Sequence, residues 1–222
     1  MAHLVDINQL DILEIDGLIS LAEKIIESPA DYQDKCARKK LATLFYEPST
    51  RTRLSFEAAM LDLGGSVLGF SSADSSSASK GESVADTIRM INCYADICAI
   101  RHPKEGSALR ASEFSKIPVI NAGDGGHQHP TQTLTDLLTI HKVKRRLGGL
   151  TIGLCGDLMF GRTVHSLIEC MTKYENNNFI LVSPDELRVP DYIREGVLVK
   201  KGTQFTETTN LTDNIAEMDI LY

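Results

Sequence analysis

The sequence lacks tryptophan altogether, and aromatic residues of all kinds make up only 6% of its 222 residues. It also lacks any apolar run near the roughly 20 residues that a membrane-spanning helix needs, so no such helix is expected. Residues 1–6 have neither the basic nor the apolar part of a signal peptide. We therefore expect a cytoplasmic protein that has no membrane partner.

Metal-binding patterns are missing as well. None of the five cysteines belongs to a Cys-x-x-Cys pair, and the histidines do not complete a zinc pattern. We therefore expect reduced cysteines, no metal site and no cofactor. The net charge of −7 argues against a nucleic-acid partner. An acidic chain can still bind a small anion where a few arginines converge.

Apolar runs typical of strands alternate along the chain with amphipathic segments typical of helices. Strands are expected at 41–46, 66–70, 96–100, 118–121, 151–155, 179–183, 203–207 and 218–222. Helices are expected at 12–28, 50–63, 82–94, 107–116, 131–146, 162–174, 190–196 and 210–216. Such alternation predicts parallel sheets with helices on both faces, which is the doubly wound α/β class.

A basic, glycine-containing stretch at 142–149 marks the expected domain boundary. The first domain would cover residues 1–147 and the second residues 148–222, where the alternation of strands and helices starts again. One low-complexity segment, Ser71–Ser79, has serine at six of its nine positions. From composition alone it is interpreted as a flexible linker.

The segment Phe45–Arg53 joins an expected strand to an expected helix and reads Phe-Tyr-Glu-Pro-Ser-Thr-Arg-Thr-Arg. Ser49 is a natural N-cap for that helix. The start of a helix attracts phosphate, because its backbone N–H groups are unpaired and its dipole is positive there. Arg51 adds a planar cation that can bind a phosphate with two hydrogen bonds. The segment therefore predicts a phosphate site, although a capped surface helix would carry a similar first turn.

Polar clusters follow four expected strands, at the edge of the sheet where ligands of open parallel sheets bind. Taken singly, Arg101 is more often a solvated charge, His129 a loop histidine and Gln132 a helix cap. Their convergence at one edge favours a site for an anion that also stabilises developing negative charge. The four clusters are Ser49–Arg53, Ser75–Lys80, Arg101–Pro103 and His127–Gln132.

Five segments together resemble the aspartate and ornithine carbamoyltransferases. Glu47 and Thr131 favour the aspartate branch, since ornithine enzymes usually have Lys and Cys there. The resemblance implies transfer of the carbamoyl group of carbamoyl phosphate to L-aspartate, a step of pyrimidine biosynthesis. It also implies that the fold continues past Tyr222, so the second domain is expected to be incomplete here. The five segments are Phe45–Arg53, Lys80–Glu82, Arg101–Gly106, His129–Gln132 and Gly156–Leu167.

The same resemblance assigns roles around carbamoyl phosphate. Arg101 would bridge the phosphate and carbonyl oxygens, and His129 would donate to the carbonyl oxygen as it becomes an oxyanion. Gln132 would accept from the carbamoyl NH2 group. Arg51, Thr52, Arg101 and His129 are the expected catalytic residues. The phosphate would be held by Ser49, Thr50, Arg51 and Thr52.

For the second substrate, the resemblance implies that Arg162 and Thr163 bind a carboxylate of L-aspartate. It further implies a homotrimer with shared active sites, in which Ser76 and Lys80 reach the site of the neighbouring subunit. In that case the serine-rich segment is a mobile lid. The resemblance leaves open whether a regulatory chain or a fused partner enzyme accompanies the catalytic chain.

Three other functions are considered. An ornithine-type or other carbamoyltransferase would use the same phosphate site. A non-catalytic module for phosphate ligands would need that site but neither His129 nor Arg162. A dinucleotide site is disfavoured, because the glycines between Gly153 and Gly161 do not have the Gly-x-Gly-x-x-Gly spacing.

Overall fold

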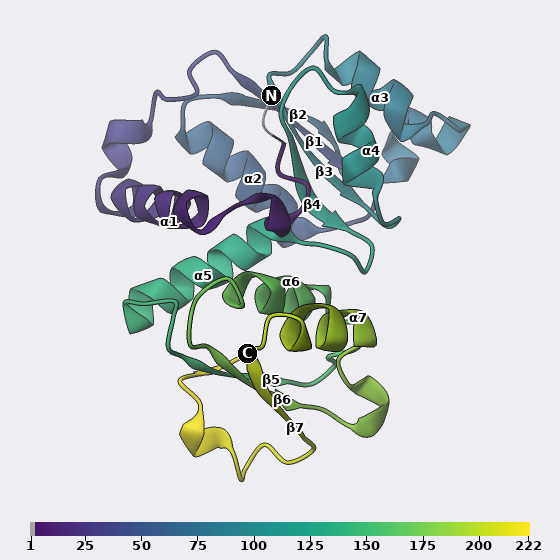
Figure 1. The fold of residues 1–222 in the computed structure, drawn as a ribbon. Helices are drawn as coiled ribbons and strands as arrows, with labels where there is room; N and C mark the ends of the chain where they lie inside the picture. Colours follow the sequence, from purple (N-terminus) through teal and green to yellow (C-terminus); the bar gives the residue numbers. More distant parts are fainter. Residues whose placement is uncertain (1–2) are drawn as a thin grey trace. The chain divides into compact units, whose positions relative to one another are not determined.

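The computed structural model describes residues 3–222; Met1 and Ala2, the first residues of the N-terminal stretch considered above, lie outside that range. The chain forms two compact units, each built on its own parallel sheet (Figure 1). The first contains the residues up to Gln9 together with Ser20–Thr131, and the second contains Leu10–Ile19 and Gln132–Tyr222. The functional boundary expected after residue 147 remains a prediction.

The first sheet has the strand order β2 (Ser66–Phe70), β1 (Lys40–Phe45), β3 (Ile97–His102), β4 (Val119–Asp124), and all its pairs are parallel. The chain moves from β1 to β2 on one side and then crosses to β3 on the other. This reversal creates a topological switch point at the carboxyl ends of β1 and β3. Open α/β sheets bind their ligands at such a point.

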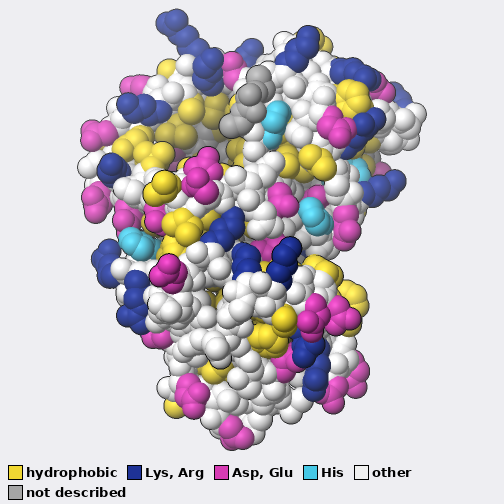
Figure 2. Space-filling view, viewed as in Figure 1, with side chains coloured by type: hydrophobic (Ala, Val, Ile, Leu, Met, Phe, Trp, Pro, Cys, Tyr) yellow, Lys and Arg dark blue, Asp and Glu magenta, His cyan; other side chains and the backbone are white. Residues whose placement is uncertain are grey.

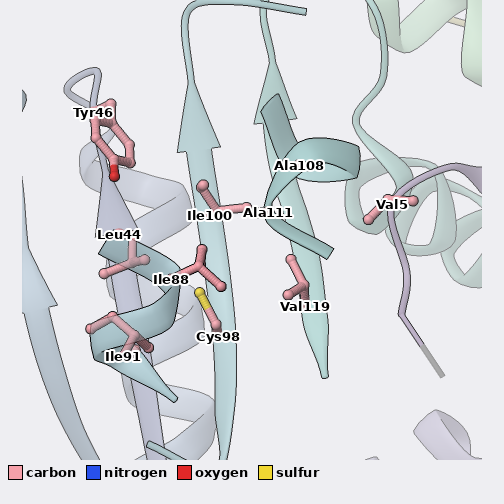
Figure 3. Packing of buried hydrophobic residues seen from close by; sticks show 11 residues of the cluster. Val5, Leu44, Tyr46, Ile88, Ile91, Cys98, Ile100, Ala108, Ala111 and Val119 are labelled. Carbon is pink, nitrogen blue, oxygen red and sulfur yellow. The ribbon is translucent and has the colours of Figure 1, made fainter. Parts of the chain in front are cut away.

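Helices cover both faces of the first sheet. On one face Leu44 and Ile100 pack with Ile88 of α3 (Val84–Ile91) and with Ala111 of α4 (Ser107–Phe114) (Figure 3). On the other face Leu41 and Ala99 pack with Met60 of α2 (Thr50–Asp62). Because successive side chains of a strand point to opposite faces, neighbouring apolar residues of β1 supply both cores. The doubly wound arrangement predicted for this half is confirmed.

The second sheet is also fully parallel, in the order β7 (Gln204–Thr208), β6 (Asn178–Val182), β5 (Thr151–Cys155), β8 (Ile220–Leu221). Its chain reverses direction across β5, so a second switch point lies at the carboxyl ends of β5 and β8. Its helices are α5 (Pro130–Lys144, entered from the first unit), α6 (Arg162–Met171) and α7 (Asp191–Ile193), which continues as a π-helical segment, Arg194–Val199.

All eight expected strands are confirmed within three residues at each end, although β8 is only two residues long. The helix α1 (Ile12–Glu27) begins with a capping box, in which Asp11 and Glu14 each accept from the other's backbone N–H. The prediction of a helix at 210–216 is wrong. There the Asn210 side chain accepts from Thr212 N at 3.0 Å, which favours a turn, and only a 3-10 helix, Ile215–Glu217, follows.

Two properties of the described chain bear on its function. None of the helices in residues 3–222 is long and apolar enough to cross a membrane. Within the same range, no group of three His, Cys, Asp or Glu residues lies close enough together to hold a metal ion. Acidic and basic side chains are interspersed over the face shown in Figure 2.

Candidate active site

The segment Phe45–Arg53, for which the sequence predicts phosphate binding, lies at the carboxyl end of β1 and therefore at the first switch point. Ser49 occupies the N-cap position with extended backbone, φ −154° and ψ 96°, and α2 begins at Thr50. In the described structure the Ser49 hydroxyl makes no capping bond to the helix, which differs from its usual use as a cap. The first-turn N–H groups are therefore left to another acceptor, which suits an anion.

A pocket of about 340 Å³ opens beside this helix start. Arg53, one of the residues that line this pocket, forms an ion pair with Glu57, at 2.9 Å from Nε to Oε1. Arg51 is exposed and Thr52 is half-buried. The pocket is lined by Pro48, Ser49, Thr50, Arg53, Leu54, Ser71 and Ser72.

Arg101 lies within β3 rather than after it, opposite Phe45 of β1. Its Nη2 atom is 2.6 Å from Oε1 of Glu47, and its Nη1 atom donates to Ala122 O at 3.2 Å. Only 12% of the Arg101 side chain is exposed. The guanidinium is therefore fixed at the switch point by bonds from two sides.

His129 is buried, and its Nδ1 atom lies 3.5 Å from Thr131 Oγ1. The backbone of Gly123, with φ +115°, passes close to both His129 and Arg101. A Cβ atom on this glycine would lie 2.8 Å from Arg101 Nη1 and 3.3 Å from His129 Cδ2. The structure thus brings together the two residues that the sequence assigned to the carbonyl oxygen.

Asp124, which sequence reasoning missed, connects the loops that carry these residues. It is 2% exposed. Its Oδ1 accepts from Asn121 Nδ2 at 2.9 Å and from Gln128 N at 3.2 Å, while its Oδ2 accepts from Gly106 N at 2.9 Å. One buried carboxylate therefore ties the end of β4 to the loops that follow β3 and precede His129. A lone acidic residue at the end of a buried strand was the available signal.

His102, the neighbour of Arg101, packs against an aromatic ring and bonds the backbone of its own loop. Its ring lies 4.7 Å from the ring of Tyr46, centroid to centroid, and its Nδ1 accepts from Lys104 N at 2.9 Å. Burial, with a smaller contribution from the Lys104 charge, lowers the pKa of His102. The neutral ring is therefore favoured near neutral pH.

The serine-rich segment forms two short 3-10 turns, Ala73–Ser75 and Ser77–Lys80. Ser76 caps the second turn by accepting from Ala78 N, and its hydroxyl donates to Ala73 O at 2.8 Å. Lys80 is exposed. The linker interpretation from composition is therefore only partly correct, and the assignment of Ser76 and Lys80 to a neighbouring subunit remains a prediction.

In the second unit, Arg162 is the first residue of α6, which follows the end of β5. The loop before it is shaped by Asp157, whose Oδ1 accepts from Met159 N at 3.1 Å and Phe160 N at 2.9 Å. The buried His165 is held between Leu158 O and the Tyr192 hydroxyl, each at 2.8 Å. Arg162 and Thr163 therefore stand on a well-defined helix start.

Gln132, the third residue of α5, bonds a side chain of its own helix. Its Nε2 donates to Asp136 Oδ1 at 2.8 Å, and Asp136 Oδ2 accepts from the hydroxyl of Tyr222 at 3.2 Å. Burial raises the pKa of Asp136, although its hydrogen bonds with Gln132 and Tyr222 lower it in part. Burial also raises the pKa of Tyr222, against the opposing effect of a hydrogen bond with Thr163. Two residues that the sequence singled out, Gln132 and Thr163, are thus linked through two that it missed.

Comparison with known proteins places this geometry in context. Residues 2–142 match the family model described as aspartate/ornithine carbamoyltransferase, carbamoyl-P binding domain. The aspartate carbamoyltransferase catalytic subunit of Lachnoclostridium phytofermentans is 65% identical over 222 residues, which cover all of this chain and 72% of the relative.

Solved structures agree with the sequence relatives. The catalytic subunit of M. jannaschii aspartate transcarbamoylase superposes with a TM-score of 0.94 at 48% identity, covering 100% of this chain and 73% of that one. Aspartate transcarbamoylase from Trypanosoma cruzi, in complex with carbamoyl phosphate and aspartate, gives a TM-score of 0.92 at 37% identity, covering 99% and 71%.

Proposed function

The chain belongs to the aspartate/ornithine carbamoyltransferase family, and we propose that it catalyses transfer of the carbamoyl group of carbamoyl phosphate to L-aspartate. The observation that carries the proposal is the approach of Arg101 and His129 to the same glycine, Gly123, at the switch point of the first sheet. Two oriented donors there suit an oxygen that gains negative charge. Residues 1–147 would bind carbamoyl phosphate, and residues 148–222 would contribute to binding aspartate.

The phosphate group would bind at the start of α2. Backbone N–H groups of the first turn, the hydroxyls of Ser49, Thr50 and Thr52, and the guanidinium of Arg51 would supply its donors. The pocket of about 340 Å³ beside the helix start has room for a ligand of this size. Binding of the dianion would also orient the carbonyl carbon for attack.

In the transfer step, the neutral amine of aspartate attacks the carbonyl carbon and a C–N bond forms. His129 and Arg101 donate to the carbonyl oxygen while it carries the negative charge of the tetrahedral intermediate. The C–O bond to phosphate then breaks, and inorganic phosphate leaves with the electron pair. The amine loses one proton, for which the departing phosphate is a suitable acceptor.

Aspartate would be recognised through its carboxylates. Arg162 and Thr163, at the start of α6, would bind one of them, because a helix start and a guanidinium both attract an anion. Near Arg162 the side-chain carboxylate of aspartate would be attracted, whereas the cationic side chain of ornithine would be repelled. This charge preference, together with Glu47 and Thr131, favours the aspartate reaction over the ornithine reaction.

The functional unit would be a homotrimer in the cytoplasm. Lys80 is exposed at the end of the second 3-10 turn, a position from which its ammonium could reach a neighbouring subunit. Ser76 would approach the same site from the same loop. Each active site would then combine a phosphate-binding helix from one subunit with a lysine loop from the next.

Calorimetric titration with carbamoyl phosphate and with inorganic phosphate tests the proposal. Arg51→Ala should weaken both ligands, whereas Gln132→Ala should weaken only carbamoyl phosphate, because the amide serves the carbamoyl end. A charged hydrogen-bonding partner is typically worth ~1.5–3 kcal/mol, which is a measurable change in affinity. Equal affinity of the wild-type protein for the two ligands would favour a non-catalytic phosphate-binding module instead.

A further inference from the structure

The carboxylate of Asp136 lies between two side chains of the second unit. Gln132, one turn earlier on α5, donates to Oδ1 through Nε2 at 2.8 Å. Tyr222, which follows β8, donates to Oδ2 through its hydroxyl at 3.2 Å. Tyr222 also interacts with Thr163 at the start of α6. Asp136 therefore stands at the second switch point, in a hydrogen-bonded row of four side chains.

This row has a direct consequence for the amide of Gln132. An amide has one end that only donates and one that only accepts, while an ionised carboxylate only accepts. Asp136 therefore bonds the nitrogen of the Gln132 amide and not its oxygen. Only one of the two orientations of the Gln132 amide allows this bond. In that orientation the amide oxygen, Oε1, points away from Asp136.

We propose that Asp136 is a specificity-determining positioning residue, which orients the Gln132 amide so that its oxygen accepts from the NH2 group of carbamoyl phosphate. The inference rests on the proposed function. It assigns to Asp136 the discrimination between a carbamoyl group, which can donate, and an acyl group of the same shape, which cannot. A flipped Gln132 would present its own NH2 group to the ligand and would repel the carbamoyl donor.

A simpler role for Asp136 is an i, i+4 pair that stabilises α5. Such pairs usually lie on exposed helix faces and contribute little. Asp136 differs because it is half-buried and because its second oxygen is bonded by Tyr222, 86 residues away in sequence. The Tyr222 hydroxyl holds the carboxylate independently of Gln132, so the carboxylate can in turn orient the amide. Burial raises the pKa of Asp136, because removing the carboxylate from water disfavours its charged form.

Acetyl phosphate provides the test, since it carries a methyl group where carbamoyl phosphate carries NH2. We define the discrimination ratio as the inhibition constant of acetyl phosphate divided by the KM for carbamoyl phosphate. The polypeptide at its natural length would be assayed with aspartate at saturation. Asp136→Ala should lower this ratio about tenfold, equivalent to about 1.4 kcal/mol. Gln132→Ala should lower it by a similar factor.

The isosteric change Asp136→Asn guards against misfolding of the alanine variant. An asparagine can accept from the Gln132 amide or donate to it, so two orientations become available. If both are equally populated, the affinity for carbamoyl phosphate falls about twofold and that for acetyl phosphate does not. Thr139→Ala, which removes an exposed side-chain bond on the same helix, is the matched control and should leave the ratio unchanged.

The double variant Gln132→Ala with Asp136→Ala separates positioning from general stabilisation. If Asp136 acts through Gln132, the second substitution lowers the ratio no further. The inference is overturned if Asp136→Ala weakens both ligands equally, or if its effect on the ratio adds to that of Gln132→Ala. Failure of the wild-type protein to use carbamoyl phosphate would instead overturn the proposed function, which keeps the two failures distinct.

Discussion

The guanidinium of Arg101 and the carboxylate of Glu47 lie 2.6 Å apart, Nη2 to Oε1, with 12% and 27% of their side chains exposed. The same guanidinium bonds Ala122 O through Nη1. A pair held in this way leaves the arginine in a single orientation. Its planar fork makes both bonds at once, which the ammonium of a lysine cannot reproduce.

Arg101→Lys should therefore impair catalysis although it keeps the charge. We expect kcat to fall on the order of 100-fold, the usual cost of losing one oriented oxyanion donor. Steady-state kinetics would measure this, and titration with inorganic phosphate should show a far smaller change in affinity. Near-normal turnover by the lysine variant would mean that Arg101 supplies charge only.

Gly123→Ala should lower turnover by displacing Arg101 and His129. A Cβ there would lie 2.8 Å from Arg101 Nη1, and the φ of +115° disfavours any side chain. We expect a loss of turnover of at least tenfold, about 1.4 kcal/mol in the activation barrier. Gly149→Ala is the control, since Gly149 also has positive φ but no described heavy atom within 4 Å of its Cβ position. Equal effects of the two substitutions on turnover would show that backbone strain alone is responsible.

Asp124→Asn should lower stability. The substitution replaces one accepting oxygen by an NH2 group, so at least one of the N–H donors around it loses its acceptor. An unsatisfied buried donor costs ~1–3 kcal/mol in the free energy of unfolding. Urea unfolding at neutral pH would measure the loss, with Asp34→Asn as a control at an exposed aspartate. A change as small as that of the control would exclude Asp124 as the link between the loops.

The cysteines should differ sharply in reactivity. Burial raises the pKa of Cys98 to about 12 and that of Cys170 to about 11. At pH 8 the reactive thiolate of Cys98 would therefore amount to about one molecule in ten thousand. A chromogenic disulfide reagent should label the exposed Cys93 and Cys155 rapidly, and it should reach the two buried thiols only after denaturation. Rapid labelling of Cys98 in the folded protein would contradict its burial.

Subunit complementation tests the shared site. Lys80→Ala and His129→Ala chains should each be inactive alone. Mixed trimers would contain some sites in which both residues are intact, if Lys80 serves the neighbouring subunit. Dissociation and reassociation of the two variants together should then restore activity. Hybrids that form, as verified by charge separation, but stay inactive would place Lys80 elsewhere.

The sequence was sufficient for features that depend on local pattern. The apolar run of β1 followed by Pro48 and Ser49 predicts both the strand end and the helix start, because each depends on neighbouring residues. The loops after β1 and β3 could be brought to one edge for the same reason, since parallel strands align their carboxyl ends. Arg101, at the end of β3, and His129, in the loop after β4, were predicted to share that edge in this way.

The network residues could not be predicted, because their roles depend on contacts between distant parts of the chain. Asp136 bonds Tyr222 across 86 residues of sequence, and Asp124 at the end of β4 bonds Gly106 at the start of α4. Neither aspartate belongs to a local motif. The wrong prediction of a helix at 210–216 has a local cause instead. The apolar residues there have helical spacing, but the side chain of Asn210 closes a turn.

The most direct test of the proposed function is an assay of carbamoyl transfer to L-aspartate. The polypeptide at its natural length would be incubated with carbamoyl phosphate labelled at the carbonyl carbon and with either L-aspartate or L-ornithine, and the products separated by charge. We predict labelled N-carbamoyl-L-aspartate with stoichiometric release of phosphate, no citrulline, and loss of the product in His129→Ala. Transfer to ornithine, or tight binding of carbamoyl phosphate without transfer to either amine, would contradict it.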